Sequence, residues 1–211
     1  MYKDKFKKFD GSYIPDIIKY LKDYIEKDPS VTISVGCDSI QVRRKTIYAV
    51  TIMMHDQDIR NGAHVVFFRE SCDKIRDIQA RLYKEAEYLN LVSEYLNLEL
   101  EKFYTRNDLT EYERRRYKYH ILKSNGEYSH VALHQEDSVI RNLTLSDSDR
   151  LEFKCIDIHV DFNPFEGDRA HKNKSYIAYR NYVPWLRALG YRVWGKPAAS
   201  AASSAADLLL H

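Results

Sequence analysis

Three apolar, β-branched segments follow one another in the first third of the chain, with only short polar connections between them. They are VTISVGCDS (31–39), KTIYAVTIMMH (45–55) and AHVVFFRES (63–71). The second connection contains Asn61-Gly62, a pair typical of tight hairpin turns. Because parallel strands need much longer crossover connections, the sequence predicts a three-stranded antiparallel meander.

The rest of the chain alternates helices and strands around this meander. Helical periodicity predicts helices over 14–27, 75–96, 176–190 and 199–210, and β-rich runs predict strands over 151–162 and 191–195. This order predicts an α/β fold with a mixed five-stranded sheet, in which parallel strands extend the antiparallel meander and helices flank the sheet. The chain has 211 residues, of which 44% are hydrophobic, and this suits one domain over 1–211.

One polar segment, approximately 97–150, interrupts the regular pattern and is interpreted as a surface insertion. Its pattern allows a helix over 108–122 and a few short strands beyond it. The basic run 114–116 could contact phosphates, although such a run is more typical of a solvated helix face.

Charge and cysteine content restrict the function only weakly. The chain has 33 basic and 31 acidic residues, a balance that neither requires nor excludes a nucleic-acid partner. Its three cysteines lack metal-site spacing, which argues against zinc and suits a reduced compartment. With no long apolar window, the sequence predicts a cytoplasmic protein without a membrane segment.

Two acidic residues lie where apolar ones are expected. Asp38 directly follows the apolar run 31–37, and Glu85 lies on the apolar stripe of the helix predicted over 75–96. A carboxylate at either place loses solvation unless it meets a cation or a hydrogen-bond donor. The simpler interpretations are that Asp38 caps a turn and that Glu85 pairs with Arg81 or Lys84 at the rim of the stripe.

Two more acids lie in the C-terminal part. In the strand over 151–162, alternation places Asp157, His159 and Asp161 on one face, so His159 is either a structural histidine or a supporting group beside Asp161. Asp207 follows a run of alanines that would let the last helix approach the sheet closely. It could equally be a solvated acid near the end of the chain.

Taken together, Asp38, Glu85, Asp161 and Asp207 follow the carboxylate order of the RNase H-like superfamily. The first lies on the first strand of the meander, the second on the following helix, the third at the end of the next strand and the fourth on the last helix. Four carboxylates gathered at one place repel one another unless cations bind between them. An all-oxygen site of this kind suits Mg²⁺ or Mn²⁺, and two ions are expected.

Longer motifs resemble a particular family, the YkuK-like family of predicted RNase H-like proteins. The resemblance covers roughly 31–96 and 151–209, and its motifs are VGCDS, RLYKEAEYLNLVSEYL, HVDFN, KNKS and GKPAASAASSAAD. It places the four acids at the acidic positions of the family, and His159 and Asn163 in its H-x-D-x-N element. Ala198 stands where the usual family ending has an aspartate, so four acidic positions are present and a fifth is absent.

The resemblance and the four acids together imply a metal-dependent nuclease that acts on RNA, DNA or a hybrid. Substrate-binding or supporting roles are expected for Ser39, His159, Asn163, Lys172, Lys174 and Lys196. Two alternatives remain at this point. One is a catalytically silent module that binds nucleic acid or protein in the same groove, and the other is a structure-selective resolvase if the protein dimerises.

Overall fold

The computed structural model describes residues 2–27, 31–55, 63–100, 156–165, 174–196, 199 and 201–210. In chain order, its elements are β1 (Lys7–Lys8), α1 (Ile17–Lys27), β2 (Thr32–Val42), β3 (Lys45–His55), β4 (Ala63–Asp73), α2 (Ile78–Leu100), β5 (Asp157–Val160), α5 (Lys174–Ala188), β6 (Arg192–Trp194) and the π-helix η1 (Ala201–Ala206). None of the helices in these ranges is long and apolar enough to cross a membrane.

The strands form one mixed sheet in the order β1-β4-β3-β2-β5-β6. β2, β3 and β4 pair antiparallel along their whole length, which confirms the predicted meander. β5 runs parallel to β2, and β6 runs parallel to β5, so the predicted α/β fold with a mixed sheet is confirmed. The sheet has a sixth strand that was not predicted, β1, because two residues are too short to show an alternating pattern.

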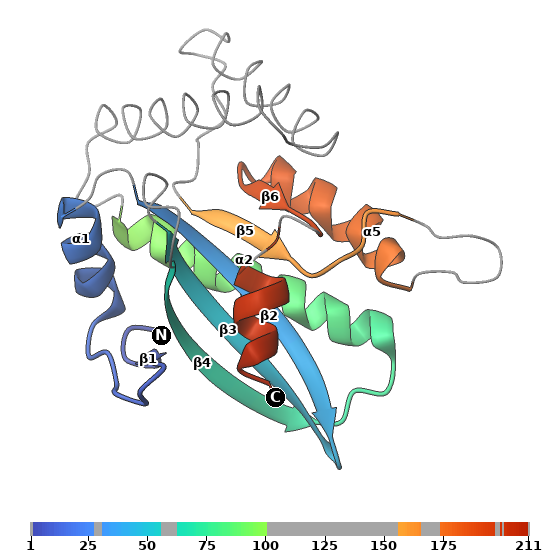
Figure 1. The fold of residues 1–211 in the computed structure, drawn as a ribbon. Coiled ribbons are helices and arrows are strands. Elements are labelled where there is room, and N and C mark those ends of the chain that lie inside the picture. Colours follow the sequence, from blue (N-terminus) through green and yellow to red (C-terminus); the bar gives the residue numbers. More distant parts are fainter. Residues whose placement is uncertain are drawn as a thin grey trace, which may run out of the picture.

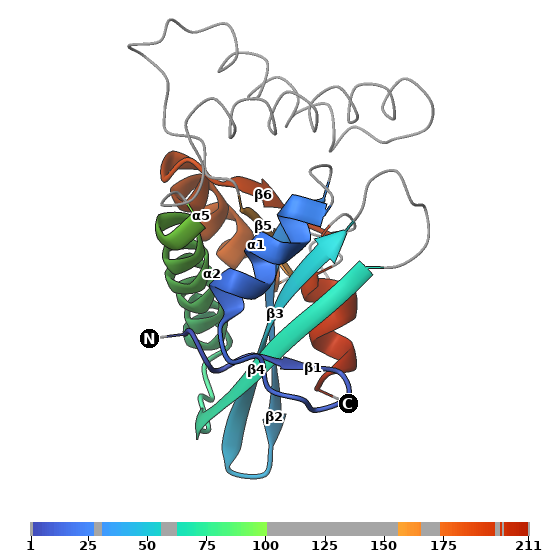
Figure 2. The ribbon, with the colours of Figure 1, turned by 90° about the vertical axis from the view of Figure 1, so that its left-hand side faces the viewer.

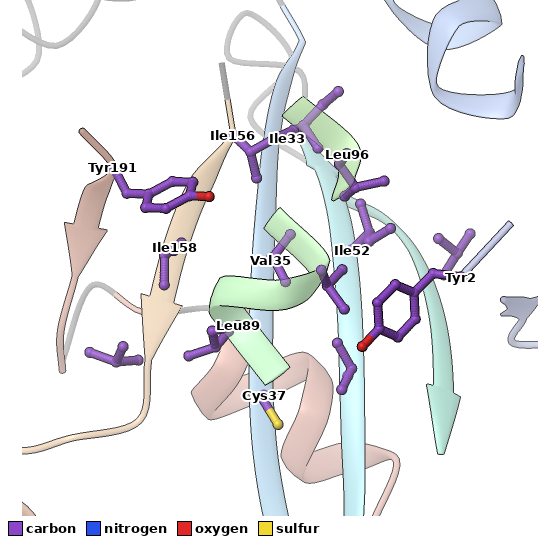
Figure 3. Close-up of a cluster of buried hydrophobic side chains, with 14 of the residues drawn as sticks. Tyr2, Ile33, Val35, Cys37, Ile52, Leu89, Leu96, Ile156, Ile158 and Tyr191 are labelled. Carbon is purple, nitrogen blue, oxygen red and sulfur yellow. The ribbon is translucent and has the colours of Figure 1, made fainter. Parts of the chain in front are cut away.

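Helices cover both faces of the sheet (Figures 1 and 2). α2 and α5 lie on one face, and η1 lies on the other, across β2 and β3. On the α2 face, alternate residues of β2 form the core with Leu89 and Leu96 of α2, as Figure 3 shows for Ile33, Val35 and Cys37. The pleat therefore turns the intervening residues of β2, which include Asp38, toward the η1 face.

Small side chains allow η1 to lie close to the sheet. Ala206 and Leu209 pack against Ala49 of β3, in a second apolar cluster separate from the main core. The Thr51 hydroxyl donates a hydrogen bond to the carbonyl oxygen of Ala201 at 2.8 Å, and Arg69 donates one to the carbonyl oxygen of Leu209. The C-terminal segment is thus fastened to β3 and β4 at both of its ends.

Several element boundaries differ from those predicted. α2 continues to Leu100, so its last turn includes residues 97–100, which had been assigned to the insertion. η1 is a π-helix from Ala201, followed by one short α-helical turn, where an α-helix over 199–210 was expected. Residues 101–155, with the helix predicted over 108–122, lie outside the described part of the chain.

Candidate functional site

The parallel register of β2 and β5 brings the first and third predicted acids together. Val160, the last residue of β5, lies opposite Cys37 of β2. Asp161 directly follows Val160 and Asp38 directly follows Cys37, so the two aspartates lie side by side where β5 ends. β2 continues to Val42 while β5 stops, and among the described residues no strand pairs with this remaining edge of β2.

Asp38 is partly buried at this point. Its Oδ1 accepts a hydrogen bond from the backbone N–H of Ser39 at 2.7 Å. The pKa of Asp38 is raised to about 6, mainly by burial; the Ser39 hydrogen bond and Arg81 lower it, and the charges of Asp161 and Asp207 raise it. This carboxylate therefore gains strongly from any cation that comes close to it.

Glu85 approaches from the opposite face of the sheet. Its side chain is only 1% exposed, which confirms the predicted inward face of α2, whereas Glu87 pairs with Lys84 at the surface. The Ser39 hydroxyl donates to Glu85 Oε1, but Oε2 is buried without a hydrogen-bond partner among the described residues. The pKa of Glu85 is raised to about 8, mainly by burial, with the Ser39 hydrogen bond lowering it and the charge of Asp38 raising it.

One of the two carboxylate oxygens of Asp161 forms an ion pair with a lysine. Lys196 Nζ lies 2.9 Å from Asp161 Oδ2, while Oδ1 is buried and has no hydrogen-bond partner in the described part of the chain. Burial raises the pKa of Asp161, Lys196 lowers it, and Asp207 raises it. Lys196, predicted to support the site, thus contacts one of its acids directly.

Asp207 is an exposed residue just after η1, and its charge acts on Asp38 and Asp161. Ala201, Ala205 and Ala206 are buried beneath it, as the predicted close approach requires. His159 is buried too, and its Nδ1 accepts a hydrogen bond from the backbone N–H of Ala201 at 3.0 Å. His159 therefore ties the start of η1 to β5.

The other residues considered in the sequence analysis have different surroundings. Asn163 organises the turn after β5, since its Oδ1 accepts from the backbone N–H of Phe165 at 3.0 Å. Lys174 is exposed at the start of α5. Asp157 is buried and pairs with Arg192 at 2.8 Å, so it belongs to the sheet interior. Lys172 lies outside the described residues.

Arg81, which had been considered only as an ion-pair partner of Glu85, also belongs to this region. Its charge lowers the pKa of Asp38 and of Glu85, where it opposes the larger effect of burial. Its Nε is buried without a hydrogen-bond partner among the described residues. The signal in the sequence was the four-residue spacing from Glu85, which places both side chains on the same side of the helix.

The donor set has the chemistry of a divalent-cation site. All four acids supply oxygen ligands, which Mg²⁺ and Mn²⁺ prefer, and two of the buried oxygens lack a hydrogen-bond donor within the described ranges. The same ranges contain no group of three or more His, Cys, Asp or Glu side chains already gathered closely enough to hold an ion. Cation binding would therefore have to draw the carboxylates closer together.

A mixed sheet that begins with an antiparallel meander, and that gathers acids beside the end of its parallel strand, defines the RNase H-like class. A family model described as ribonuclease H-like matches residues 16–209. The chain therefore belongs to the ribonuclease H-like family. Searches of curated proteins and of solved structures gave no significant match.

The buried Glu85 leads to a prediction about pH. In metal-free buffer, the unfolded chain loses this proton near pH 4.5, whereas the folded protein keeps it up to about pH 8. A rise in pH between these values therefore favours the unfolded state, so the free energy of unfolding should fall across this range. Glu85→Gln, which does not titrate, should show a smaller fall. Urea unfolding at several pH values in EDTA measures the difference, and equal slopes would contradict the burial of an ionisable Glu85.

Proposed function

We propose that this protein is a divalent-metal-dependent nuclease that hydrolyses phosphodiester bonds in nucleic acid. The observation that supports this proposal is the convergence of acids at the end of β5. Asp38 and Asp161 lie side by side there, Glu85 accepts a hydrogen bond from the neighbouring Ser39, and the charge of Asp207 acts on both aspartates. A structural core does not need four carboxylates near one another, since their mutual repulsion and their burial both destabilise it. The ribonuclease H-like fold is consistent with a nucleic-acid substrate.

Each acid has a distinct part in this proposal. Asp38 and Asp161 are central, because they lie side by side at the end of β5 and the charge of Asp207 raises the pKa of each. Glu85 completes the site from the α2 side, and Asp207 completes it from the η1 side. Two bound ions would supply an activated water and neutralise the charge that develops on the leaving oxygen. Ser39 holds Glu85 in place through its hydroxyl.

The direct test is cleavage of labelled single-stranded RNA, single-stranded DNA and an RNA–DNA hybrid in Mg²⁺, in Mn²⁺ and in EDTA. We expect cleavage of at least one substrate in the presence of either ion, and no cleavage in EDTA. Asp38→Asn, purified in the same way, is the control for contaminating nucleases. If the wild-type protein and Asp38→Asn cleave equally, the activity does not belong to this site.

Metal binding should also appear in the thermal stability. Divalent ions that bind only the folded protein stabilise it by mass action, by about 2.7 kcal/mol at a hundred times the Kd. For a chain of this size each kcal/mol raises Tm by about 2–4 °C, so millimolar Mn²⁺ should raise Tm by several degrees relative to EDTA. Asp38→Asn should lose most of this rise. An equal rise in both proteins would place the bound ion elsewhere.

A binding module without catalysis is the second candidate. It is favoured by the contact between Lys196 and Asp161, which satisfies one acid without a metal, and by the absence of a ready three-ligand group among the described residues. This candidate predicts that the protein binds the same nucleic acids in EDTA and in Mn²⁺ without cleaving them. Cleavage that Asp38→Asn abolishes would exclude it.

A further inference from the structure

Arg81 acts on the acidic cluster, by which we mean Asp38, Glu85, Asp161 and Asp207, without forming an ion pair with it among the described residues. It lies on α2 four residues before Glu85, a spacing at which arginine and glutamate commonly form an ion pair. Here Glu85 instead accepts a hydrogen bond from the hydroxyl of Ser39 on the neighbouring strand β2. Within the described part of the chain, no carboxylate lies within ion-pair distance of the Arg81 guanidinium, although its charge acts on both Asp38 and Glu85.

The guanidinium therefore has donors that the described residues do not use. Its Nε is buried and lacks a hydrogen-bond partner among them. A buried donor without an acceptor is costly, because it has lost its bonds to water and gained none in exchange. Arginine has five N–H donors in a planar fork, and this geometry matches a phosphate group.

Among the described residues, Lys196 and Arg81 both act on the acids but differ in what they contact. Lys196 is engaged with Asp161, so it screens one acid directly. Arg81 is near the acids but unpaired among the described residues, so it can accept an incoming anion without breaking an ion pair. The edge of β2 from Asp38 to Val42 has no strand partner on the β5 side in the described ranges, and thus leaves polar backbone beside the same cluster.

We propose that Arg81 binds a phosphate group of the nucleic acid whose backbone lies at the acidic cluster. This inference rests on the proposed function, since it concerns the substrate of the same site. A phosphodiester that approaches carboxylates is repelled by them, and a cation fixed beside them offsets that repulsion. Arg81 is then a substrate-binding residue that positions the strand, with no part in holding the metal.

The experiment compares Arg81→Gln, Arg81→Lys and Lys19→Gln with the wild-type protein. Lys19 is a charge-matched control, since it lies on α1 and pairs with Asp23 at the surface. Binding of a fluorescent oligonucleotide of the form that the wild-type protein cleaves is measured in EDTA over a series of KCl concentrations. The same oligonucleotide with Mn²⁺ gives KM and kcat, and thermal melts monitor folding.

For Arg81→Gln we expect binding weaker by about tenfold at low salt, and a slope of log K against log salt smaller by about 0.7–0.9, which corresponds to one lost phosphate contact. KM should rise more than kcat falls. Arg81→Lys should keep most of the slope, because it keeps the charge. Lys19→Gln should bind like the wild-type protein.

Two results would overturn the role of Arg81 alone. One is an Arg81→Gln slope equal to that of Lys19→Gln while the wild-type protein binds and cleaves. The other is a loss of affinity accompanied by a lower Tm and an unchanged slope, which would show that Arg81 only supports the fold. A wild-type protein that neither binds nor cleaves nucleic acid would instead remove the proposed function itself.

Discussion

Glu85→Gln is expected to lower metal-dependent cleavage by at least about 10²-fold while the protein stays folded. The substitution keeps the shape of the side chain and removes the charge that the proposed ions need. It also removes a buried carboxylate whose pKa burial raises to about 8, so the free energy of unfolding at neutral pH should stay constant or increase. Cleavage rates in Mn²⁺ and urea unfolding at the same pH measure the two effects.

The matched control is Glu87→Gln, two residues further along the same helix. Glu87 pairs with Lys84 at the surface, and exposed pairs of this kind contribute little to stability. Its removal should therefore leave cleavage and unfolding nearly unchanged. If both variants lose activity equally, or if neither does, Glu85 does not belong to a metal site.

Asp207→Asn is expected to reduce cleavage strongly, by about 10²-fold or more, without destabilising the protein. The side chain is exposed, so little packing is lost. Its charge raises the pKa of both Asp38 and Asp161, after the larger effect of burial, so the substitution relieves repulsion in the metal-free state. Glu94→Gln, at an exposed position of α2, is the control for the loss of one surface charge.

Ala206→Leu should destabilise the protein, whereas Asp207→Asn should not. Ala206 is fully buried against Ala49, and added methyl groups in a packed contact cost about 1–3 kcal/mol. Ser204→Leu, at an exposed position of the same helix, should leave Tm nearly unchanged. An unaffected Tm in Ala206→Leu, or full cleavage by Asp207→Asn, would show that η1 does not present Asp207 to the other acids.

The sequence was informative where a regular pattern extended over many residues. The meander followed from three β-rich runs and their short connections, and the buried side of α2 followed from its apolar stripe, which includes Glu85. The neighbourhood of Asp38 and Asp161 was predictable as well, because Asp38 comes directly after the apolar run 31–37 and Asp161 comes near the end of the strand predicted over 151–162. In the structure Asp161 follows β5, whereas Asp38 lies inside β2, which continues to Val42. These features depend on local periodicity and on the general rules of strand connection.

Other features depend on contacts between distant segments, which one sequence does not specify. β1 exists because Lys7 and Lys8 pair with Phe67 and Val66 of β4. The π-helical form of η1 accompanies bonds from Ala201 to Thr51 and His159, and tertiary contacts of this kind override the helix propensity of an alanine-rich run. Arg81 lacks an ion-pair partner among the described residues for a similar reason, because Glu85 accepts a hydrogen bond from the Ser39 hydroxyl, a contact that no spacing rule predicts.

The attachment of η1 also determines when the acidic cluster can form during synthesis. β2, β3, β4 and α2 lie within residues 32–100 and can pair with one another early, whereas Asp161 needs β5, and Asp207 needs the segment held by Thr51, His159 and Arg69. The ribosome releases these segments after the meander and α2. A nascent or prematurely terminated chain would therefore have the meander and α2 but an incomplete set of carboxylates, and the activity proposed for the cluster would begin only after the C-terminal helix has docked.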